Sequence, residues 1–344
     1  MKEVVLGLIG AGRIGRLHAE NLTRHVPGAR LKGVSDLVGE AATRCARDFG
    51  IPQVYETPEA LLSDPEIEAV LICTSTHTHA QLVCQAAAAG KHVFCEKPLA
   101  LDLAHIGEAL AAVEEAGVLL QVGFHRRFDP NFRRLKELLD KGEIGTPWLL
   151  KITSYDPEPP PPAYVRVSGG IFLDMTIHDF DMARFLLGEV DEVLAVGAVL
   201  VDPEIGAAGD VDTAVVTLKF VTGALGVITN SRRAVYGHDQ RIEVLGERGG
   251  LWAENPLPDT ATVADKQGYR TSPLHHFFVE RYREAYIAEL RAFVDALRQG
   301  TESPVSGLDG KIPVVMGYAA KRSLAERRPV ALSEIDPTLA GPQR

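Results

Sequence analysis

A lysine follows a short apolar run in the segment Val93-Phe94-Cys95-Glu96-Lys97-Pro98. The run predicts a buried parallel strand, and in open α/β sheets the carboxyl ends of the strands form the ligand crevice. We therefore expect Lys97 at the mouth of that crevice, with Pro98 restricting its backbone. That is a position suited to chemistry. A surface lysine at a strand-to-helix turn explains this hexapeptide equally well.

A second group of ionisable side chains lies in residues 168–188, which begin near a glycine pair and predict one helix ending at Gly188. Asp174 and His178 are spaced i and i+4, and Asp181 follows at i+7, so all three should project from one face of that helix. Three interpretations are open: a capping acid beside a structural histidine, a metal site, or an acid/base dyad in which the carboxylate orients the imidazole. The dyad is favoured because Lys97 and a dinucleotide-binding signature occur in the same chain.

That signature is a glycine-rich turn between a predicted strand and a predicted helix. An apolar run near the amino terminus leads into Gly10, Gly12 and Gly15, at the spacing G-x-G-x-x-G. The glycines permit a tight turn, close approach of the backbone to a pyrophosphate and close helix packing, while the helix amino terminus offers N–H groups to the anion. We predict that this turn binds a dinucleotide, with Arg13 and Ile14 among its contacts.

Asp36 ends a second predicted strand, residues 29–35, about 20 residues beyond the last glycine of the turn. An acid at this place can bind the ribose hydroxyls, and it repels a 2′-phosphate. The next residue, Leu37, supplies no positive charge to receive a phosphate. A turn or cap residue is the alternative role for Asp36. Together with the glycine turn, it predicts NAD rather than NADP as the cofactor.

Strands and helices alternate over the first 123 residues. Further strands are predicted at 69–73, 93–95 and 119–122, and helices at 38–49, 81–89 and 102–117. Repeated strand and helix with short connections predicts a doubly wound parallel sheet. We therefore predict an α/β fold whose amino-terminal part, residues 1–123, is a Rossmann dinucleotide-binding domain.

Polar residues follow the predicted strand 69–73 and should lie on the nicotinamide side of the crevice. The cofactor contacts predicted here and at the next two strands are Thr74, Ser75, Thr76, His79, Glu96, Lys97 and Gln121. His77 and His79 also raise the question of a metal, but no cysteine or carboxylate cluster accompanies them. We expect these histidines to line the site or to cap a helix, and we expect no metal.

Beyond Gly123 the pattern becomes that of an α+β domain, predicted over residues 124–344. Strands are predicted at 148–155, 192–200, 213–220, 224–232 and 241–245. In residues 213–220 apolar side chains alternate with others, and Thr222-Gly223 predicts a hairpin turn into the next strand. These features predict an open, mostly antiparallel sheet, one face of which can pack on helices or on another subunit. A long helix is predicted over residues 276–298, and packing of the carboxyl-terminal helix on the first domain is an option.

Composition narrows the class of protein. With 46% hydrophobic residues, 24% charged residues and a net charge of −10, the chain of 344 residues has the make-up of a globular protein and argues against nucleic acid as a partner. Its four cysteines form no CxxC pair, which fits a reducing cytoplasm. Met1-Lys2-Glu3 lead directly into a strand without the layout of a signal peptide, and the apolar runs fall short of the ~20 residues that span a bilayer. We expect a cytoplasmic protein with no membrane partner.

The motifs together resemble one known family, the inositol dehydrogenases within the glucose-fructose oxidoreductase, inositol dehydrogenase and MocA group. The resemblance covers essentially the whole chain. It is carried by Gly10-Ala11-Gly12, by Cys95-Glu96-Lys97-Pro98-Leu99, by Gln121-Val122-Gly123-Phe124 with Arg126-Arg127-Phe128-Asp129, by residues 174–181, by Tyr236-Gly237 and by residues 281–290. The family implies NAD-dependent oxidation of a ring secondary alcohol to a ketone, in a two-domain subunit that usually forms homotetramers through its open sheet.

The resemblance also implies roles for particular residues. Lys97, Asp174 and His178 match the catalytic trio of the family, and the implied substrate contacts are Lys97, Arg126, Asp156, Asp174, His178, Asp181 and Tyr236. Departures leave the choice of cyclitol, myo-inositol or scyllo-inositol, open: His125 stands where methionine is frequent, and Ser154 and Asp156 stand where some members place histidine and asparagine.

On this hypothesis His178 removes the hydroxyl proton, Asp174 fixes its imidazole and Lys97 donates a hydrogen bond to the substrate oxygen. The ordinary pKa of a histidine, ~6.5, suits such a base, so activity should rise with pH. One alternative is a dehydrogenase of the same family acting on an aldose or another polyol. The alternative from another class is a dinucleotide-binding sensor without chemistry, which would have no need of a base.

Overall fold

The structure, a computed structural model, describes residues 3–339 and divides into two compact units. The first unit comprises Met1–Phe128 and Glu284–Val314, and the second comprises Asp129–Arg283 and Val315–Arg344. Residues 284–314 thus group with the amino-terminal part of the chain. Met1 and Lys2, on which the expectation about a signal peptide rested in part, lie outside the described residues, as do residues 340–344.

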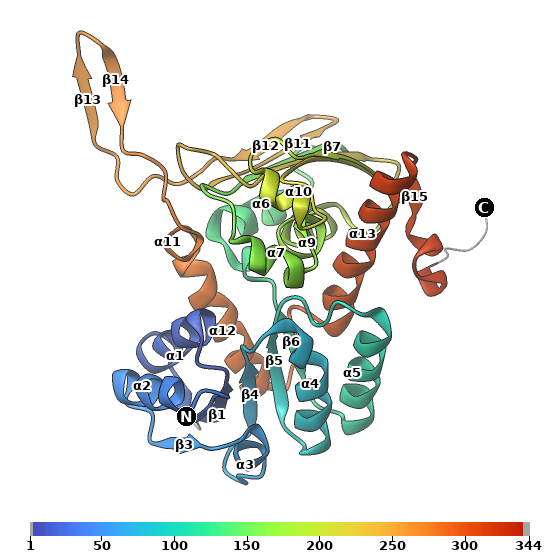
Figure 1. Ribbon diagram of the computed structural model, residues 1–344. Coiled ribbons are helices and arrows are strands. Elements are labelled where there is room, and N and C mark those ends of the chain that lie inside the picture. The colour runs from blue at the N-terminus through green and yellow to red at the C-terminus, as the bar shows by residue number, and fades with distance from the viewer. Residues whose placement is uncertain (1–2, 340–344) are drawn as a thin grey trace. The chain divides into compact units, whose positions relative to one another are not determined.

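The first unit is built on a six-stranded sheet in the order β3-β2-β1-β4-β5-β6, and every pair of neighbours is parallel (Figure 1). Its strands are β1 (Val4–Ile9), β2 (Ala29–Ser35), β3 (Gln53–Tyr55), β4 (Ala69–Ile72), β5 (His92–Glu96) and β6 (Leu120–Gly123). Its helices are α1 (Arg13–Arg24), α2 (Gly39–Phe49), α3 (Pro58–Leu62), η1 (Thr76–Thr78), α4 (His79–Ala88), α5 (Leu103–Ala116) and η2 (His125–Phe128), with α12 (Arg283–Gln299) returning from later in the chain. The predicted Rossmann-type sheet is confirmed.

Local signals explain where these helices begin and end. Asp102 caps α5 by accepting hydrogen bonds from the backbone N–H groups of Ala104 and His105, at 2.8 and 3.2 Å. Gly117 and Gly50 end α5 and α2 in the left-handed conformation, with φ of 62° and 67°. Such ends favour glycine because a Cβ is disfavoured at positive φ.

The second unit is built on a seven-stranded sheet in the order β12-β11-β7-β10-β9-β8-β15. Its strands are β7 (Pro147–Tyr155), β8 (Val190–Ala198), β9 (Thr213–Phe220), β10 (Leu225–Ser231), β11 (Asp239–Gly246), β12 (Gly249–Ala253) and β15 (Val330–Ala331). Only the pair of β10 with β7 is parallel among the pairs of this sheet in the described residues. The predicted, mostly antiparallel sheet is therefore confirmed.

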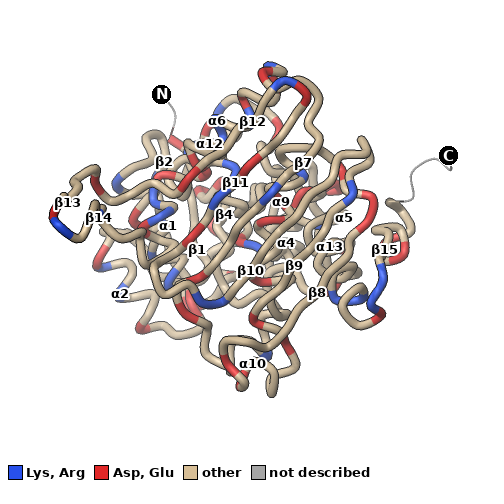
Figure 2. The backbone as a smooth tube through the Cα atoms, turned by 90° about the horizontal axis from the view of Figure 1, so that it is seen from above, with Lys and Arg blue, Asp and Glu red and all other residues tan. Residues whose placement is uncertain are grey.

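The two faces of this sheet differ in burial. Along β9 the side chains alternate as predicted: Ala214, Val216, Leu218 and Phe220 are buried, and the residues between them are exposed or half-buried. Figure 2 shows β8, β9 and β10 side by side with few charged residues, and β10 carries none. One face thus packs into the core and the other is open.

Helices of the second unit pack against this sheet, with α9 (Thr176–Leu187) against β7 and β10. The other helices of the unit are α6 (Pro130–Asp140), α7 (Pro162–Ser168), α8 (Ile171–Asp174), α10 (Pro203–Ala207), α11 (Phe278–Arg281), η3 (Leu332–Glu334), η4 (Pro337–Leu339) and α13 (Gly307–Glu326), which begins in the first unit and continues into the second. A two-stranded hairpin of β13 (Thr262–Asp265) and β14 (Gly268–Thr271) projects from the rest of the unit (Figure 1).

The single helix predicted over residues 276–298 is wrong, because the chain forms α11 and α12 with a break at Tyr282. The break has a tertiary cause. Tyr282 is 1% exposed and lies under the guanidinium of Arg281, 4.6 Å from its ring centroid. Arg281 in turn forms an ion pair of 2.6 Å with Asp129, a buried carboxylate far away in the sequence. Helical periodicity in the local sequence cannot predict these contacts.

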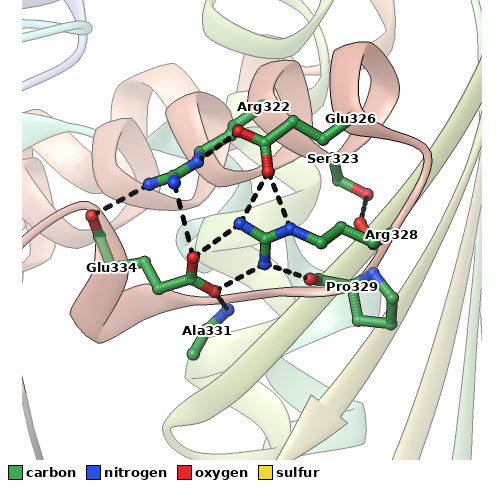
Figure 3. A network of polar contacts seen from close by, with 7 residues as sticks. All are labelled: Arg322, Ser323, Glu326, Arg328, Pro329, Ala331 and Glu334. Atoms are coloured by element: carbon green, nitrogen blue, oxygen red, sulfur yellow. Dashed lines mark hydrogen bonds and ion pairs between the residues drawn. The ribbon is translucent and has the colours of Figure 1, made fainter.

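A network of ion pairs fixes the turn after α13 (Figure 3). The Arg328 guanidinium lies 2.7 Å from Glu334 and 2.6 Å from Glu326. Ser323 joins this turn to the sheet, because its hydroxyl donates to the Arg328 carbonyl at 2.6 Å and accepts from the Ala195 N–H at 2.9 Å. The turn is thereby held against β8.

Across residues 3–339, no helix combines the length and the apolar character that crossing a membrane requires.

Burial along β9 gives a first prediction. Leu218→Ala should lower the free energy of unfolding by about 2–5 kcal/mol, because the Leu218 side chain is fully buried and its truncation leaves a cavity in the core. The matched control, Thr217→Ala, changes the neighbouring exposed residue and should change this free energy by less than about 1 kcal/mol. Urea denaturation measures both. Equal losses in the two variants would contradict the assignment of the faces.

Candidate active site

The glycine turn has the close packing that its sequence predicted. Gly10 has a φ of +100°, and a Cβ there would lie 2.6 Å from the Cys73 carbonyl oxygen. A Cβ on Gly15 would lie 1.9 Å from the Gly10 carbonyl oxygen. Gly12 differs, since a Cβ there meets nothing within 4 Å. Two of the glycines are therefore required by the packing of α1 on the sheet, whereas Gly12 leaves open space at the amino terminus of α1.

This end of α1 suits a pyrophosphate. Gly12 is the N-cap and has no side chain with which to cap the first turn. The first turn holds Arg13, which is exposed, and no acidic residue. Uncapped N–H groups and the positive end of the helix dipole attract an anion. The residues present therefore fit the phosphate groups of NAD.

Asp36 lies beside the glycine turn. Its Oδ2 accepts a hydrogen bond of 2.6 Å from the Ala11 N–H, and its Oδ1 accepts one of 2.8 Å from the Val38 N–H. The carboxylate thus anchors the turn to the end of β2. It is half-exposed and keeps further lone pairs with which to accept from hydroxyl groups. The predicted role at the ribose and the alternative role in a turn are compatible in this geometry.

A hollow lies next to this turn. It has a volume of ≈ 300 Å³ and is lined by Ala11, Arg16, Ala41, Arg44 and Asp48. Arg16 donates to Asp48 at 2.8 Å across it. This hollow was not predicted, because its walls come from the glycine turn, α1 and α2, which are brought together only by folding.

His79 is buried, with 1% of its surface exposed. Its Nδ1 lies 2.9 Å from the Pro98 carbonyl oxygen, and its Nε2 lies 3.0 Å from the Thr74 carbonyl oxygen. Burial lowers the pKa of His79, although the hydrogen bonds to these carbonyls oppose the shift. The ring therefore joins the loops that follow β4 and β5. Ser75 is exposed and Thr76 is half-buried in the same loop.

Lys97 follows the last residue of β5, as predicted, and is half-buried. The peptide bond between Lys97 and Pro98 is cis. The preceding carboxylate, Glu96, accepts a hydrogen bond of 3.3 Å from the Lys97 N–H and lies 2.7 Å from Nε2 of His18. A Cβ on Gly123 of the neighbouring strand would lie 3.2 Å from this carboxylate. Glu96 is thus fixed from three sides.

His18 and Glu289 were missed by the sequence reasoning. One nitrogen or oxygen atom from each of His18, Glu96 and Glu289 forms a group in which all three lie within 4.8 Å of one another. His18 and Glu289 are fully buried. Burial and the neighbouring Glu96 raise the pKa of Glu289 well above its ordinary value. Two charged carboxylates at this separation would repel by roughly 3 kcal/mol at an effective dielectric constant of about 20.

A signal for Glu289 does exist in the sequence. Tyr286, Leu290 and Phe293 form the buried side of α12, and Glu289 falls on the same side. The predicted cofactor contact Gln121 lies close by, fully buried, and its Nε2 donates to the Glu289 carbonyl oxygen at 3.0 Å. An acid inside an apolar helical stripe needs a partner, which the sequence alone does not identify.

Arg126 lies in the first unit within η2 and is buried, as are its neighbours His125 and Arg127. The His125 ring stacks on Tyr286 with centroids 4.3 Å apart. Arg127 forms an ion pair of 2.9 Å with Asp309. The whole short helix is therefore held by side chains of the returning segment.

Asp174 and His178 lie in the second unit, but the single helix predicted for them is wrong. Asp174 is the last residue of α8 and His178 is the third residue of α9, with Met175 between the two helices. The Thr176 hydroxyl donates to Oδ1 of Asn230 in β10 at 2.7 Å. The same Thr176 hydroxyl lies 3.2 Å from the Ile171 carbonyl oxygen of α8, and Asn230 also donates to Asp179 at 2.8 Å, so the start of α9 is tied to the sheet as well as to α8.

Two side chains hold the Asp174 carboxylate. Tyr164 donates to its Oδ1 at 2.9 Å, and Arg232, only 1% exposed, donates to its Oδ2 at 3.3 Å. The helix that carries Tyr164, α7, was not predicted. His178 is 8% exposed and Asp181 is fully buried on the same helix.

The other predicted substrate contacts of the second unit lie near the ends of β7 and β11. Asp156 lies 3.4 Å from Nδ1 of His238, a buried histidine that was not predicted. Tyr236 is 53% exposed, and its hydroxyl donates to Asp239 at 2.8 Å. Burial and this hydrogen bond raise the pKa of Tyr236 to about 12. Its hydroxyl therefore stays protonated at neutral pH.

Comparison with known proteins places the chain. Residues 4–124 match the oxidoreductase family with an NAD-binding Rossmann fold, and residues 132–252 match the GFO/IDH/MocA carboxyl-terminal domain. The chain therefore belongs to the GFO/IDH/MocA family of oxidoreductases, with NAD as cofactor. The resemblance stated from its motifs is confirmed.

Individual relatives cover nearly the whole chain. The chain is 54% identical over 331 residues to the myo-inositol 2-dehydrogenase of Thermotoga maritima, a match that covers 96% of this chain and 99% of that protein. It is 40% identical over 331 residues to the NAD(+) scyllo-inositol 2-dehydrogenase of Bacillus subtilis, covering 96% of each. Among solved structures, the scyllo-inositol dehydrogenase of Lactobacillus casei with bound NAD(H) and scyllo-inositol has a TM-score of 0.89 and 29% identity, covering 96% of this chain and 100% of that chain.

The unequal packing of the glycines gives a second prediction. Gly15→Ala should destabilise the protein and abolish NAD binding, because its Cβ would collide with the Gly10 carbonyl. Gly12→Ala should keep the melting temperature and still weaken NAD binding, since its methyl group enters only the space left for the pyrophosphate. Thermal unfolding and calorimetric titration with NAD separate the two effects. Undiminished binding by Gly12→Ala would place the pyrophosphate elsewhere.

Proposed function

We propose that this protein oxidises a ring secondary alcohol of a cyclitol, myo-inositol or scyllo-inositol, to the ketone with NAD. The observation that carries the proposal is full-length similarity to inositol dehydrogenases, at 54% identity to the Thermotoga maritima protein. The chain also holds an ionisable residue at each position that the resemblance makes catalytic. The proposed catalytic residues are Lys97, Asp174 and His178.

In this mechanism His178 accepts the proton of the reacting hydroxyl. Asp174 orients its imidazole and stabilises the imidazolium, and Tyr164 and Arg232 keep the Asp174 carboxylate in place. Lys97 donates a hydrogen bond to the substrate oxygen. Bound NAD supplies the hydride acceptor. The protein's contribution is to position the alcohol and to handle its proton.

We further propose contacts for the cofactor and the substrate. The cofactor contacts are Gly10, Gly12, Arg13, Ile14, Gly15, Asp36, Thr74, Ser75, Thr76, His79, Glu96, Lys97 and Gln121. Of these, His79 and Gln121 are buried, and their side chains hydrogen-bond to backbone carbonyl oxygens. We propose that they affect NAD indirectly, His79 through the loops that it joins and Gln121 through its contact with α12. The remaining proposed substrate contacts are Arg126, Asp156, Asp181 and Tyr236.

A substrate panel tests the proposal. NADH formation with NAD and myo-inositol, scyllo-inositol or glucose should be largest with a cyclitol. A preference for glucose would instead support the aldose dehydrogenase. Tight NAD binding without turnover of any cyclitol or sugar would support the sensor.

A third prediction concerns the proposed base. His178→Ala should lower kcat by on the order of 100 to 10,000-fold, because the proton acceptor is lost. The parent rate should rise with pH, since only the neutral imidazole accepts a proton. Steady-state kinetics measure both, and the dissociation constant for NAD serves as the control because it should be unchanged. Turnover within a few-fold of the parent would refute the assignment.

We propose that the protein works in the cytoplasm as a homotetramer formed through the open face of the second sheet. Its four cysteines are all free, as a reducing compartment allows. The open face exposes Val196, Val215 and Leu225, at 64%, 46% and 49%. Val196 and Val215 are paired across β8 and β9. Exposed apolar side chains gathered on one face of a sheet are typical of an interface.

This gives a fourth prediction. Changing Val196 and Val215 together to glutamate should convert the tetramer to smaller species, because charges would be buried without partners. The control is Val263→Glu in the projecting hairpin, where the valine is 55% exposed. Size-exclusion chromatography with light scattering reports the masses. A monomeric parent would refute the proposed assembly.

A further inference from the structure

Three elements of the first unit bring ionisable groups together behind Lys97. His18 comes from α1, Glu96 from the end of β5 and Glu289 from α12. In the described structure neither carboxylate oxygen of Glu289 has a hydrogen-bond partner, and both are buried. A buried, ionised carboxylate without a donor is strongly disfavoured, so this arrangement requires a bound cation or a proton.

The surroundings of Glu289 do not favour its ionisation. The ionisable groups that face it or lie next to it are Glu96 and His18, the thiols of Cys73 and Cys95 on β4 and β5, and Tyr286 one turn earlier on α12. Burial raises the pKa of both thiols, which therefore stay neutral. His18 is already engaged with Glu96 at 2.7 Å. The imidazole of His18 therefore hydrogen-bonds to the Glu96 carboxylate and is not available to Glu289. We infer that Glu289 is the carboxyl group that holds the proton.

We propose that Glu289 is a carboxylic acid at neutral pH, that it shares one negative charge with Glu96, and that this cluster is a positioning device for Lys97. A proton explains the geometry better than a metal ion. The distance of 2.7 Å between Nε2 of His18 and Oε1 of Glu96 is that of a hydrogen bond, and a metal would have to take over both of those atoms.

The cluster reaches Lys97 through Glu96. The Glu96 carboxylate accepts from the Lys97 N–H at 3.3 Å and from His18, while Gly123 closes its third side. A carboxylate held in this way fixes the backbone from which the Lys97 side chain departs. His18 and Glu289 are therefore positioning residues. This second part of the inference rests on the proposed function, since it assumes that Lys97 acts on the substrate.

The fifth prediction tests the proton by stability. The folded pKa of Glu289 is raised, so the native state keeps a proton that the unfolded chain releases above its ordinary pKa of ~4.3. The stability that this proton contributes is fully present below that pKa and is lost as the pH rises above it. The folding equilibrium constant falls by up to tenfold per pH unit. Glu289→Gln cannot lose the proton, so its advantage over the parent should grow with pH between about 5 and 8.

Denaturation across this pH range measures the difference between variant and parent. The control Glu284→Gln removes an exposed carboxylate of the same helix and should follow the parent at every pH. A difference for Glu289→Gln that stays constant with pH would overturn the assignment of the proton. So would elemental analysis that finds a stoichiometric metal in the purified parent and none in Glu289→Gln.

A kinetic arm tests the link to Lys97. His18→Phe removes the donor to Glu96 and should lower kcat for the cyclitol on the order of 10-fold or more, with the dissociation constant for NAD within a few-fold of the parent. His18→Gln keeps an N–H at a similar reach and should recover much of the rate. Equal losses in kcat and in NAD affinity, or no rescue, would overturn the positioning role. A parent without turnover of any cyclitol would refute the proposed function. The denaturation experiment would still decide whether Glu289 is protonated.

Discussion

The parallel direction of every strand in the first sheet is the constraint on which its site depends. Because β1, β2, β4, β5 and β6 run the same way, their carboxyl ends meet at one edge. Gly10, Asp36, Thr74 and Lys97 each follow one of these ends. The close approach at Gly15, where a Cβ would lie 1.9 Å from the Gly10 carbonyl, sets α1 at the same edge. Residues far apart in sequence are collected there by topology alone.

Features governed by local interactions could be predicted from the sequence. The bounds of β1, β2 and β9 follow from apolar runs and from alternation, and the cap at Asp102 follows from its hydrogen bonds to the next turn. The breaks at Met175 and Tyr282 could not be predicted in this way. Thr176 is tied to Asn230, 54 residues later, and Arg281 to Asp129, 152 residues earlier. Periodicity along a helix carries no information about such partners.

The candidate site shows the same division. Residue types at strand ends identified Asp36 and Lys97, because the position itself is informative. His79 was recognised as significant, but not as a buried link between two carbonyls. Glu289 lies in the apolar stripe of α12. Its spatial neighbour Glu96 is 193 residues earlier in the sequence. Only the fold shows that the two carboxyls share one buried space.

The two units stabilise a carboxylate in different ways. Arg232 and Tyr164 donate to Asp174, and a guanidinium keeps its charge at any pH that the protein survives, so Asp174 has a partner suited to a permanent negative charge. Glu96 instead has an imidazole, a backbone N–H and a second carboxyl group nearby. None of these partners is a permanent cation, and Glu289 adds no second negative charge while it holds its proton. The carboxylate of Asp174 thus receives a fixed cation, whereas that of Glu96, which holds the Lys97 backbone, has a protonated neighbour.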